Sequence, residues 1–153
     1  MLDDETVSVV EVDKRRYLDL LLLADEDVRS IDLYLDRGEL LVMDIGQDTV
    51  AVCVTTDEGG GVLEVQSLAV RPDWQRRGLG SRMLAEVEAR NRGRFDTIII
   101  GTGDSPITVP FYQACGYTIY KRIPRGVADA YDHPIFENGI QLIDKVYLRR
   151  QIS

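Results

Sequence analysis

The stretch that most constrains the fold is residues 62–92, where the period of the hydrophobic pattern changes from two to about 3.6. The segment "VLEVQSLAV" (62–70) alternates in a way that predicts a β-strand. A helical pattern over 78–92 follows at once, with an apolar stripe made of Leu79, Met83, Leu84 and Val87. A strand that leads into a helix through one short turn is typical of mixed α/β domains.

The turn itself, "RPDWQRRGLG", combines glycine with positive charge. The first N–H groups of a helix have no internal partner, and the helix dipole adds partial positive charge there. Gly78 and Gly80 carry no Cβ and would let an anion approach the backbone, while Arg76 and Arg77 would supply charge-assisted hydrogen bonds. A phosphate site and a plain tight connector both fit these residues. The Walker and dinucleotide-binding glycine patterns are absent.

The rest of the chain reads as alternating strands and helices. Expected strands are 6–12, 39–46, 49–57, 62–70, 96–103, 117–123 and 140–152; expected helices are 13–25, 26–38, 78–92 and 105–116; a long loop covers 124–139. This order, β-α-α-β-β-β-α-β-α-β-β, predicts a mixed α/β fold with about seven strands and about four helices. The length fits a single domain over residues 1–153.

Charge is distributed unevenly along the chain, whose formal net charge is −8. Residues 1–60 carry 16 acidic and 5 basic side chains, whereas residues 61–120 carry 6 acidic and 7 basic ones. The net charge argues against nucleic-acid binding by phosphate neutralisation. An anionic cofactor would prefer the second region and a cationic substrate the first.

Two further features bear on where the protein works. No apolar run approaches the roughly 20 residues of a membrane span, and the acidic start "MLDDETVSVV" is unlike a signal peptide. We therefore expect a cytoplasmic protein. Cys53 and Cys115 are expected to be buried free thiols, and no cluster of His and Cys suggests a metal site.

Three motifs, in order, carry a resemblance to a known family. The segment "VRPDWQRRGLGSRML" resembles the acetyl-CoA pyrophosphate loop of the GNAT superfamily of N-acetyltransferases, whose pattern is [Gln/Arg]-x-x-Gly-x-[Gly/Ala]. The preceding "LEVQSLAV" resembles the fourth strand of the family, and "PFYQACGY" resembles its "FYxxxGF" helix end. The resemblance covers residues 40–120, and the two ends agree in topology.

The resemblance implies an acyl-CoA N-acyltransferase fold with a mostly antiparallel central sheet, and acetyl-CoA as cosubstrate without a metal. The implied cofactor-binding residues are Leu68, Ala69, Val70, Gln75, Arg76, Arg77, Gly78, Leu79, Gly80, Ser81, Ser105 and Tyr112. The backbone of Leu68 and Val70 would pair with the pantetheine arm, and the segment 75–81 would hold the pyrophosphate. Ser105 stands where many members have asparagine, so pantetheine binding would differ in detail there. The adjacent Asp104 is expected to cap the following helix.

Two catalytic residues follow from the same resemblance. Tyr112 matches the tyrosine that protonates the departing thiolate as general acid; its alternative role is a core aromatic. Glu64 matches the general base that removes a proton from the amine; its alternative role is a solvated strand residue. Strand alternation places Glu64, Gln66 and Leu68 on one face, unless a bulge changes the parity.

The acceptor side is less defined. The junction "ADEDVRS" groups Asp25, Glu26 and Asp27, which suit either a helix N-cap and first turn or the attraction of a cationic amine. The loop 124–139 would cover the acceptor site or form a homodimer contact. The expected function is acetyl transfer to a primary amine of a small molecule or peptide. A non-catalytic acyl-CoA sensor, a preference for succinyl- or propionyl-CoA, and a protein lysine or N-terminal acetyltransferase are the alternatives.

Overall fold

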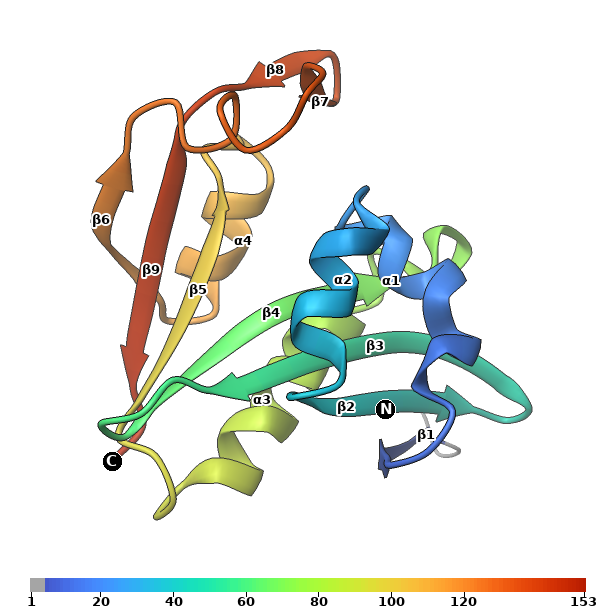
Figure 1. Ribbon diagram of the computed structural model, residues 1–153. Helices are drawn as coiled ribbons and strands as arrows, with labels where there is room; N and C mark the ends of the chain where they lie inside the picture. The colour runs from blue at the N-terminus through green and yellow to red at the C-terminus, as the bar shows by residue number, and fades with distance from the viewer. Residues whose placement is uncertain (1–4) are drawn as a thin grey trace.

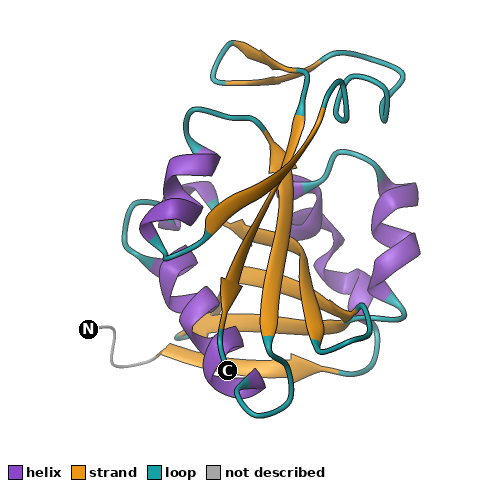
Figure 2. Ribbon diagram, turned by 90° about the vertical axis from the view of Figure 1, so that its left-hand side faces the viewer, coloured by secondary structure: helices purple, strands orange, loops and turns teal. Residues whose placement is uncertain are grey.

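A seven-stranded sheet forms the central layer of the molecule, with helices on both of its faces, as Figure 1 and Figure 2 show. The computed structural model describes residues 5–153. The strands of this sheet are β1 (Glu5–Val10), β2 (Glu39–Ile45), β3 (Asp48–Asp57), β4 (Val62–Val70), β5 (Thr97–Gly103), β6 (Thr118–Ile123) and β9 (Lys145–Gln151). Their order is β1-β2-β3-β4-β5-β9-β6, and each neighbouring pair is antiparallel except β4 and β5. The expected mixed α/β fold with a mostly antiparallel sheet is confirmed.

Four α-helices and two short 3₁₀ segments connect the strands. They are η1 (Lys14–Tyr17), α1 (Leu18–Ala24), α2 (Val28–Leu35), η2 (Pro72–Trp74), α3 (Leu79–Asn91) and α4 (Thr108–Ala114). None of these helices is long and apolar enough to cross a membrane. The first residues of the acidic N-terminal segment, 1–4, lie outside the described residues.

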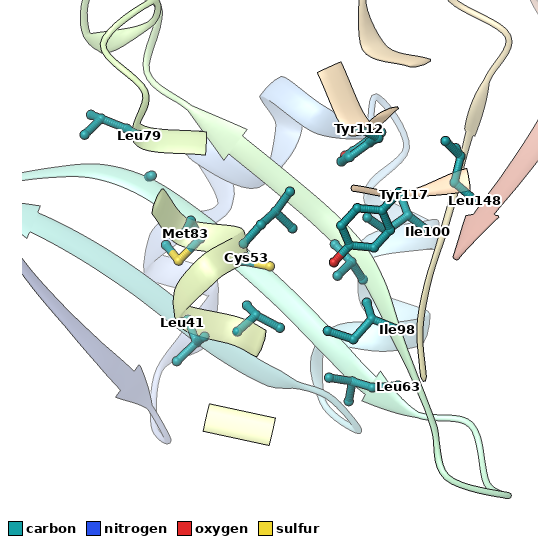
Figure 3. Packing of buried hydrophobic residues seen from close by; sticks show 14 of the residues in the cluster. Leu41, Cys53, Leu63, Leu79, Met83, Ile98, Ile100, Tyr112, Tyr117 and Leu148 are labelled. Carbon is teal, nitrogen blue, oxygen red and sulfur yellow. The ribbon is translucent and has the colours of Figure 1, made fainter. Parts of the chain in front are cut away.

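Each face of the sheet has its own hydrophobic core. Helices α1 and α2 bury leucines and an isoleucine against β2, β3 and β4 on one face; Leu20, Leu21, Ile31 and Leu35 are fully buried there. Helices α3 and α4 cover the other face, where Met83 and Leu84 pack with Ile98, Ile100 and Leu148 (Figure 3). Burying apolar surface contributes about 25 cal/mol per Å² to the stability of a fold, so these two cores are the main stabilising contribution here.

The C-terminal third differs from the expectation drawn from the sequence. The stretch expected as one strand, 140–152, is broken between β8 (Ile140–Leu142) and β9, and β8 pairs instead with β7 (Ile135–Glu137). The break occurs because the carbonyl of Ile143 accepts hydrogen bonds from Val127 N (2.9 Å) and Ala128 N (3.1 Å). The carbonyl of Asp144 accepts another from Asp104 N (3.0 Å). The expected loop 124–139 therefore ends in a short hairpin, which stands beyond the tips of β5 and β9 in Figure 1.

Candidate active site

The turn between β4 and α3 presents a row of backbone N–H groups to solvent. Arg76 and Gly78 both adopt left-handed backbone conformations, with φ of 64° and 78°. Left-handed residues alternating with right-handed ones form concave N–H nests that bind anions. Within the described residues, no acceptor is found for the backbone N–H groups from Arg76 to Ser81, the last of them in the first turn of α3. The segment is thus a candidate anion site at a helix N-terminus.

Side chains around this turn hold its shape. Gln75 Nε2 donates to Val70 O (3.0 Å), which fastens the turn to the end of β4. The guanidinium of Arg77 stacks over the Trp74 ring at 4.6 Å and donates to Asp73 O (3.3 Å). The Arg76 side chain is exposed, so its guanidinium can contact a ligand directly. Both arginines lie within the turn that carries the N–H groups, where their charge adds to its attraction for a polyphosphate.

Tight packing joins the start of α3 to α4. A Cβ at Gly80 would lie 3.0 Å from Phe111 Cζ, so residue 80 has to be small. Ser81 Oγ lies 3.5 Å from the Cys115 sulfur. Leu79 is buried in the core and can serve an anion only through its backbone. Cys53 is fully buried as expected, whereas Cys115 is only half-buried, which corrects the expectation for that thiol.

Next to the anion site, β4 and β5 separate from each other. Their parallel pairing ends at Val65 and Ile100. Beyond that pair, β4 continues to Val70 in contact with β3, and β5 continues to Gly103 in contact with β9. Figure 1 shows the two strands diverging. The edge of β4 that faces β5 therefore has no strand partner over residues 66–70, and its backbone is open to an extended ligand such as a pantetheine arm.

A β-bulge at Gln66 reverses the facing of β4 halfway along its length. Ser67 pairs with Val54 and Val65 with Thr55, so Gln66 is the extra residue. Before the bulge, Glu64 faces the α1/α2 side; after it, Leu68 and Val70 face the α3/α4 core, and Ala69 faces α1/α2. The expectation that Glu64 and Leu68 share a face is wrong, because the bulge shifts the parity by one.

Glu64 lies in the wall of a cavity of about 790 Å³ between the α1/α2 side and the hairpin β7–β8. Its carboxylate is half-buried, and within residues 5–153 no side chain forms an ion pair with it. Burial, and secondarily the nearby Glu58, raises the pKa of Glu64 above its ordinary value, while Lys145 and Arg37 oppose the shift. A partly desolvated carboxylate of raised pKa is suited to proton transfer near neutral pH.

Tyr112 projects from α4 into the core on the opposite side of the sheet. Its ring is 8% exposed and packs edge-on against Phe111 (5.2 Å between centroids) and Tyr117 (6.2 Å). Figure 3 shows the rings of Tyr112 and Tyr117 side by side. Burial raises the pKa of Tyr112, and the neighbouring Cys53 adds to the shift. The phenol therefore remains protonated at neutral pH and can act as a donor.

Ser105 lies just before α4, and its hydroxyl binds backbone N–H groups at the start of that helix. Its Oγ accepts hydrogen bonds from Ile107 N and Thr108 N (both 3.1 Å) and donates to Glu137 Oε1 (2.9 Å). Asp104, expected to be the cap, instead forms an ion pair with Arg122 at 2.6 Å. Ser105 as a whole is 1% exposed, and its contact with a cofactor remains a prediction.

The acidic junction before α2 serves as both cap and cavity wall. Asp27 caps α2 by accepting from Arg29 N (2.9 Å). Asp25 accepts from Tyr34 Oη and Tyr131 Oη, both at 3.4 Å, and Glu26 lies 3.1 Å from His133 Nε2. Tyr131 and His133 of the segment 124–139 thus contact this junction, and whether the segment covers an acceptor or forms a dimer contact remains a prediction.

The cavity residues that the sequence did not identify include Arg37, Gly101 and Lys145. Each lies in or next to a helix or strand whose type the sequence predicts correctly. Their convergence depends on which strands are neighbours, because β9 inserts between β5 and β6. No local pattern in the sequence signals that arrangement.

The candidate site thus combines N–H groups at a helix start that have no acceptor among the described residues, a gap between two parallel strands, and a carboxylate and a phenol on opposite faces of the sheet. The family model of the acetyltransferase (GNAT) domain matches residues 36–119. The chain belongs to the GNAT family of acetyltransferases, and the resemblance seen in its motifs is confirmed.

Individual relatives agree with this assignment. An uncharacterized N-acetyltransferase of Bacillus subtilis, YvbK, is 37% identical over 132 residues, which are 85% of each chain. A GNAT family acetyltransferase from Elizabethkingia anophelis, crystallised with acetyl-CoA bound, superposes with a TM-score of 0.91 at 29% identity, over 97% of this chain and 99% of that one. A Bacillus subtilis acetyltransferase in complex with CoA gives a TM-score of 0.88 at 34% identity, over 96% and 98%.

Proposed function

We propose that this protein is a single-domain, cytoplasmic N-acetyltransferase that transfers the acetyl group of acetyl-CoA to a primary amine. The observation that carries the proposal is the row of N–H groups from Arg76 to Ser81 beside the β4–β5 gap. The N–H groups lie next to the open edge of β4, and this arrangement suits a pyrophosphate that is followed by an extended, amide-bearing arm. The two structural relatives with acetyl-CoA or CoA bound support the same donor.

The proposed chemistry is direct attack. Glu64 takes a proton from the ammonium form of the acceptor, directly or through a water, since an alkylammonium has a pKa of about 10. The amine nitrogen then bonds to the acetyl carbon, the carbon–sulfur bond breaks, and Tyr112 donates its proton to the leaving thiolate. The nitrogen releases its second proton to solvent as the amide forms, and the Tyr112 phenolate takes a proton back from solvent. Glu64 and Tyr112 lie on opposite faces of the sheet, which suits a base for one substrate and an acid for the other.

Calorimetry with acetyl-CoA, followed by turnover against a panel of amines, tests the proposal. We expect binding in the micromolar range and release of free CoA thiol in the presence of an acceptor. Replacing both Arg76 and Arg77 with alanine should weaken binding by about 10- to 100-fold, from the loss of charge-assisted hydrogen bonds. No detectable binding at millimolar acetyl-CoA would refute the donor assignment, and binding without turnover of any amine would favour a sensor.

A further inference from the structure

Lys145 is a cation on the same wall of the acceptor cavity as Glu64. It begins β9, in which Val146 and Leu148 point into the α3/α4 core. Alternation along the strand therefore sends Lys145 and Tyr147 to the other face, and Lys145 lines the cavity together with Glu64 and Gly101. Helices α1 and α2 cover only the β2–β4 part of that face. In the part of the chain that the structure describes, no helix therefore packs over Lys145, which is half-buried in the cavity wall.

The side chain of Lys145 has a defined position. Its ammonium lies 5.0 Å from the centre of the Tyr147 ring, within the range of a cation–π contact. A Cβ on Gly101 would come within 2.8 Å of Lys145 Cε and 2.7 Å of Tyr147 Cε1. Both side chains thus lie across β5 at Gly101, which has no Cβ to block them. The lysine is directed toward β4 and Glu64.

The other charges of the cavity have partners. Arg37 forms an ion pair with Glu58 at 3.0 Å. Asp25 accepts from two tyrosines and Glu26 contacts His133. Glu137 Oε1 accepts from Ser105 Oγ (2.9 Å) and Thr108 Oγ1 (2.8 Å).

Lys145 and Glu64 are different. Within residues 5–153, no carboxylate lies within 4.0 Å of the Lys145 ammonium, and no ion pair reaches Glu64. The described part of the wall thus holds one cation without an ion pair, on β9, and one carboxylate with neither an ion pair nor a hydrogen bond, on β4, with β5 between the two strands. A ligand that carries both opposite charges would compensate them, and it would offset the desolvation cost of each.

We infer that the acceptor is an amino-carboxylate, whose amine faces Glu64 and whose carboxylate binds the Lys145 ammonium. The inference rests on the proposed N-acetyltransferase function and specifies its substrate class. A diamine would leave Lys145 facing a second cation, and a simple monoamine would leave it without a counter-ion. Lys145 acts here as a specificity-determining residue, held in place by Tyr147 and by the absence of a side chain at Gly101.

The test compares amino acids with their own amides. The acceptors are the ω-amino acids from glycine to 6-aminohexanoate, each measured beside its amide and beside 1,4-diaminobutane, by release of CoA thiol. The wild type should prefer at least one acid over its amide in kcat/KM. In Lys145→Met that preference should fall by about 10- to 100-fold, mainly through KM, from loss of a charged hydrogen bond. Lys145→Arg should keep part of it.

A matched control is available on the same ring. Lys121 also lies over Tyr147, at 5.7 Å, but does not line the cavity. Lys121→Met should leave the acid-to-amide ratio unchanged. The ratio is also insensitive to the effect of Lys145 on the pKa of Glu64, because that effect acts on acid and amide alike. Calorimetry with acetyl-CoA checks that each variant remains folded.

The outcomes separate the two proposals. Equal use of acids and amides by the wild type, preference for the diamine, or an unchanged ratio in Lys145→Met would overturn the inference and leave the acetyltransferase proposal standing. Absence of acetyl-CoA binding would overturn both. A preference for the acid that Lys145→Met removes and Lys121→Met retains would support the inference.

Discussion

Replacing Tyr112 with phenylalanine removes one oxygen atom from a ring that is otherwise fixed by its neighbours. The ring contacts with Phe111 and Tyr117 persist in the variant. Within the described residues the Tyr112 hydroxyl has no protein hydrogen-bond partner, so stability should change by less than about 1 kcal/mol. Loss of a general acid should lower kcat by about 10²- to 10⁴-fold, equivalent to about 3–5 kcal/mol of barrier.

Tyr117→Phe is the matched control, because it makes the same change at a centroid distance of 6.2 Å. The Tyr117 hydroxyl donates to Glu88 Oε2 at 3.2 Å in the buried core. A buried hydrogen bond to a charged group contributes about 1.5–3 kcal/mol. At about 2–4 °C per kcal/mol for a chain of this size, Tm should fall by roughly 3–12 °C, with kcat retained.

Steady-state kinetics at saturating acetyl-CoA and thermal unfolding of both variants measure the two effects. Because burial raises the pKa of Tyr112, the phenol is protonated throughout the assay range. The ratio of wild-type to Tyr112→Phe turnover should therefore be constant from pH 6 to 9. Turnover within threefold of wild type, or a rate loss that follows the loss of folded protein, would refute the assignment of Tyr112 as the acid.

Three further predictions concern Glu64, Gly78 and His133. Glu64→Gln should lose turnover most between the raised pKa of Glu64 and the pKa of the amine, about 10, and the wild-type kcat/KM should fall as pH drops through the raised pKa of Glu64; a mutant-to-wild-type ratio that is flat across pH argues against a base. Gly78→Ala and Gly46→Ala should each cost about 1–2 kcal/mol, because φ is 78° and 62° with no atom near the new methyl group, yet only Gly78→Ala should weaken acetyl-CoA binding in calorimetry. The carboxylates of Asp132 and Glu26 raise the pKa of His133, so its contribution to stability is present below the unfolded pKa of about 6.5 and is lost as pH rises through the folded value. Since the chain has one histidine, NMR titration of its ring protons reads this directly, and a titration at or below 6.5 contradicts it.

Local patterns account for the parts of the fold that the sequence predicts well. The strand 62–70 and the helix that follows are found almost as expected, because alternation, helical spacing and Gly78 all lie within the segment itself. The anion site follows from the same few residues. Motif spacing was also sufficient to place Tyr112 on its helix.

Relations between distant segments account for the rest. The bulge at Gln66 exists only as a register difference between β3 and β4, so strand alternation cannot locate it. The break before β9 depends on backbone donors at Val127 and Ala128. Lys145 can lie over Gly101 only because β9 is next to β5 in the sheet. Nothing in the sequence around either residue indicates that the two strands are neighbours.

The bulge in β4 has a consequence for how this protein can change over evolution or in engineering. It shifts the alternation of side chains by one residue, so that Glu64 before it and Ala69 after it face the α1/α2 side, whereas Leu68 and Val70 face α3 and α4. The acceptor wall is built largely from residues before position 38 and after position 100, whereas the anion site lies within 70–81. Mutations that retune the proposed acceptor cavity can therefore accumulate outside the 70–81 turn, and the nine residues of β4 are the segment that the cavity and the turn share.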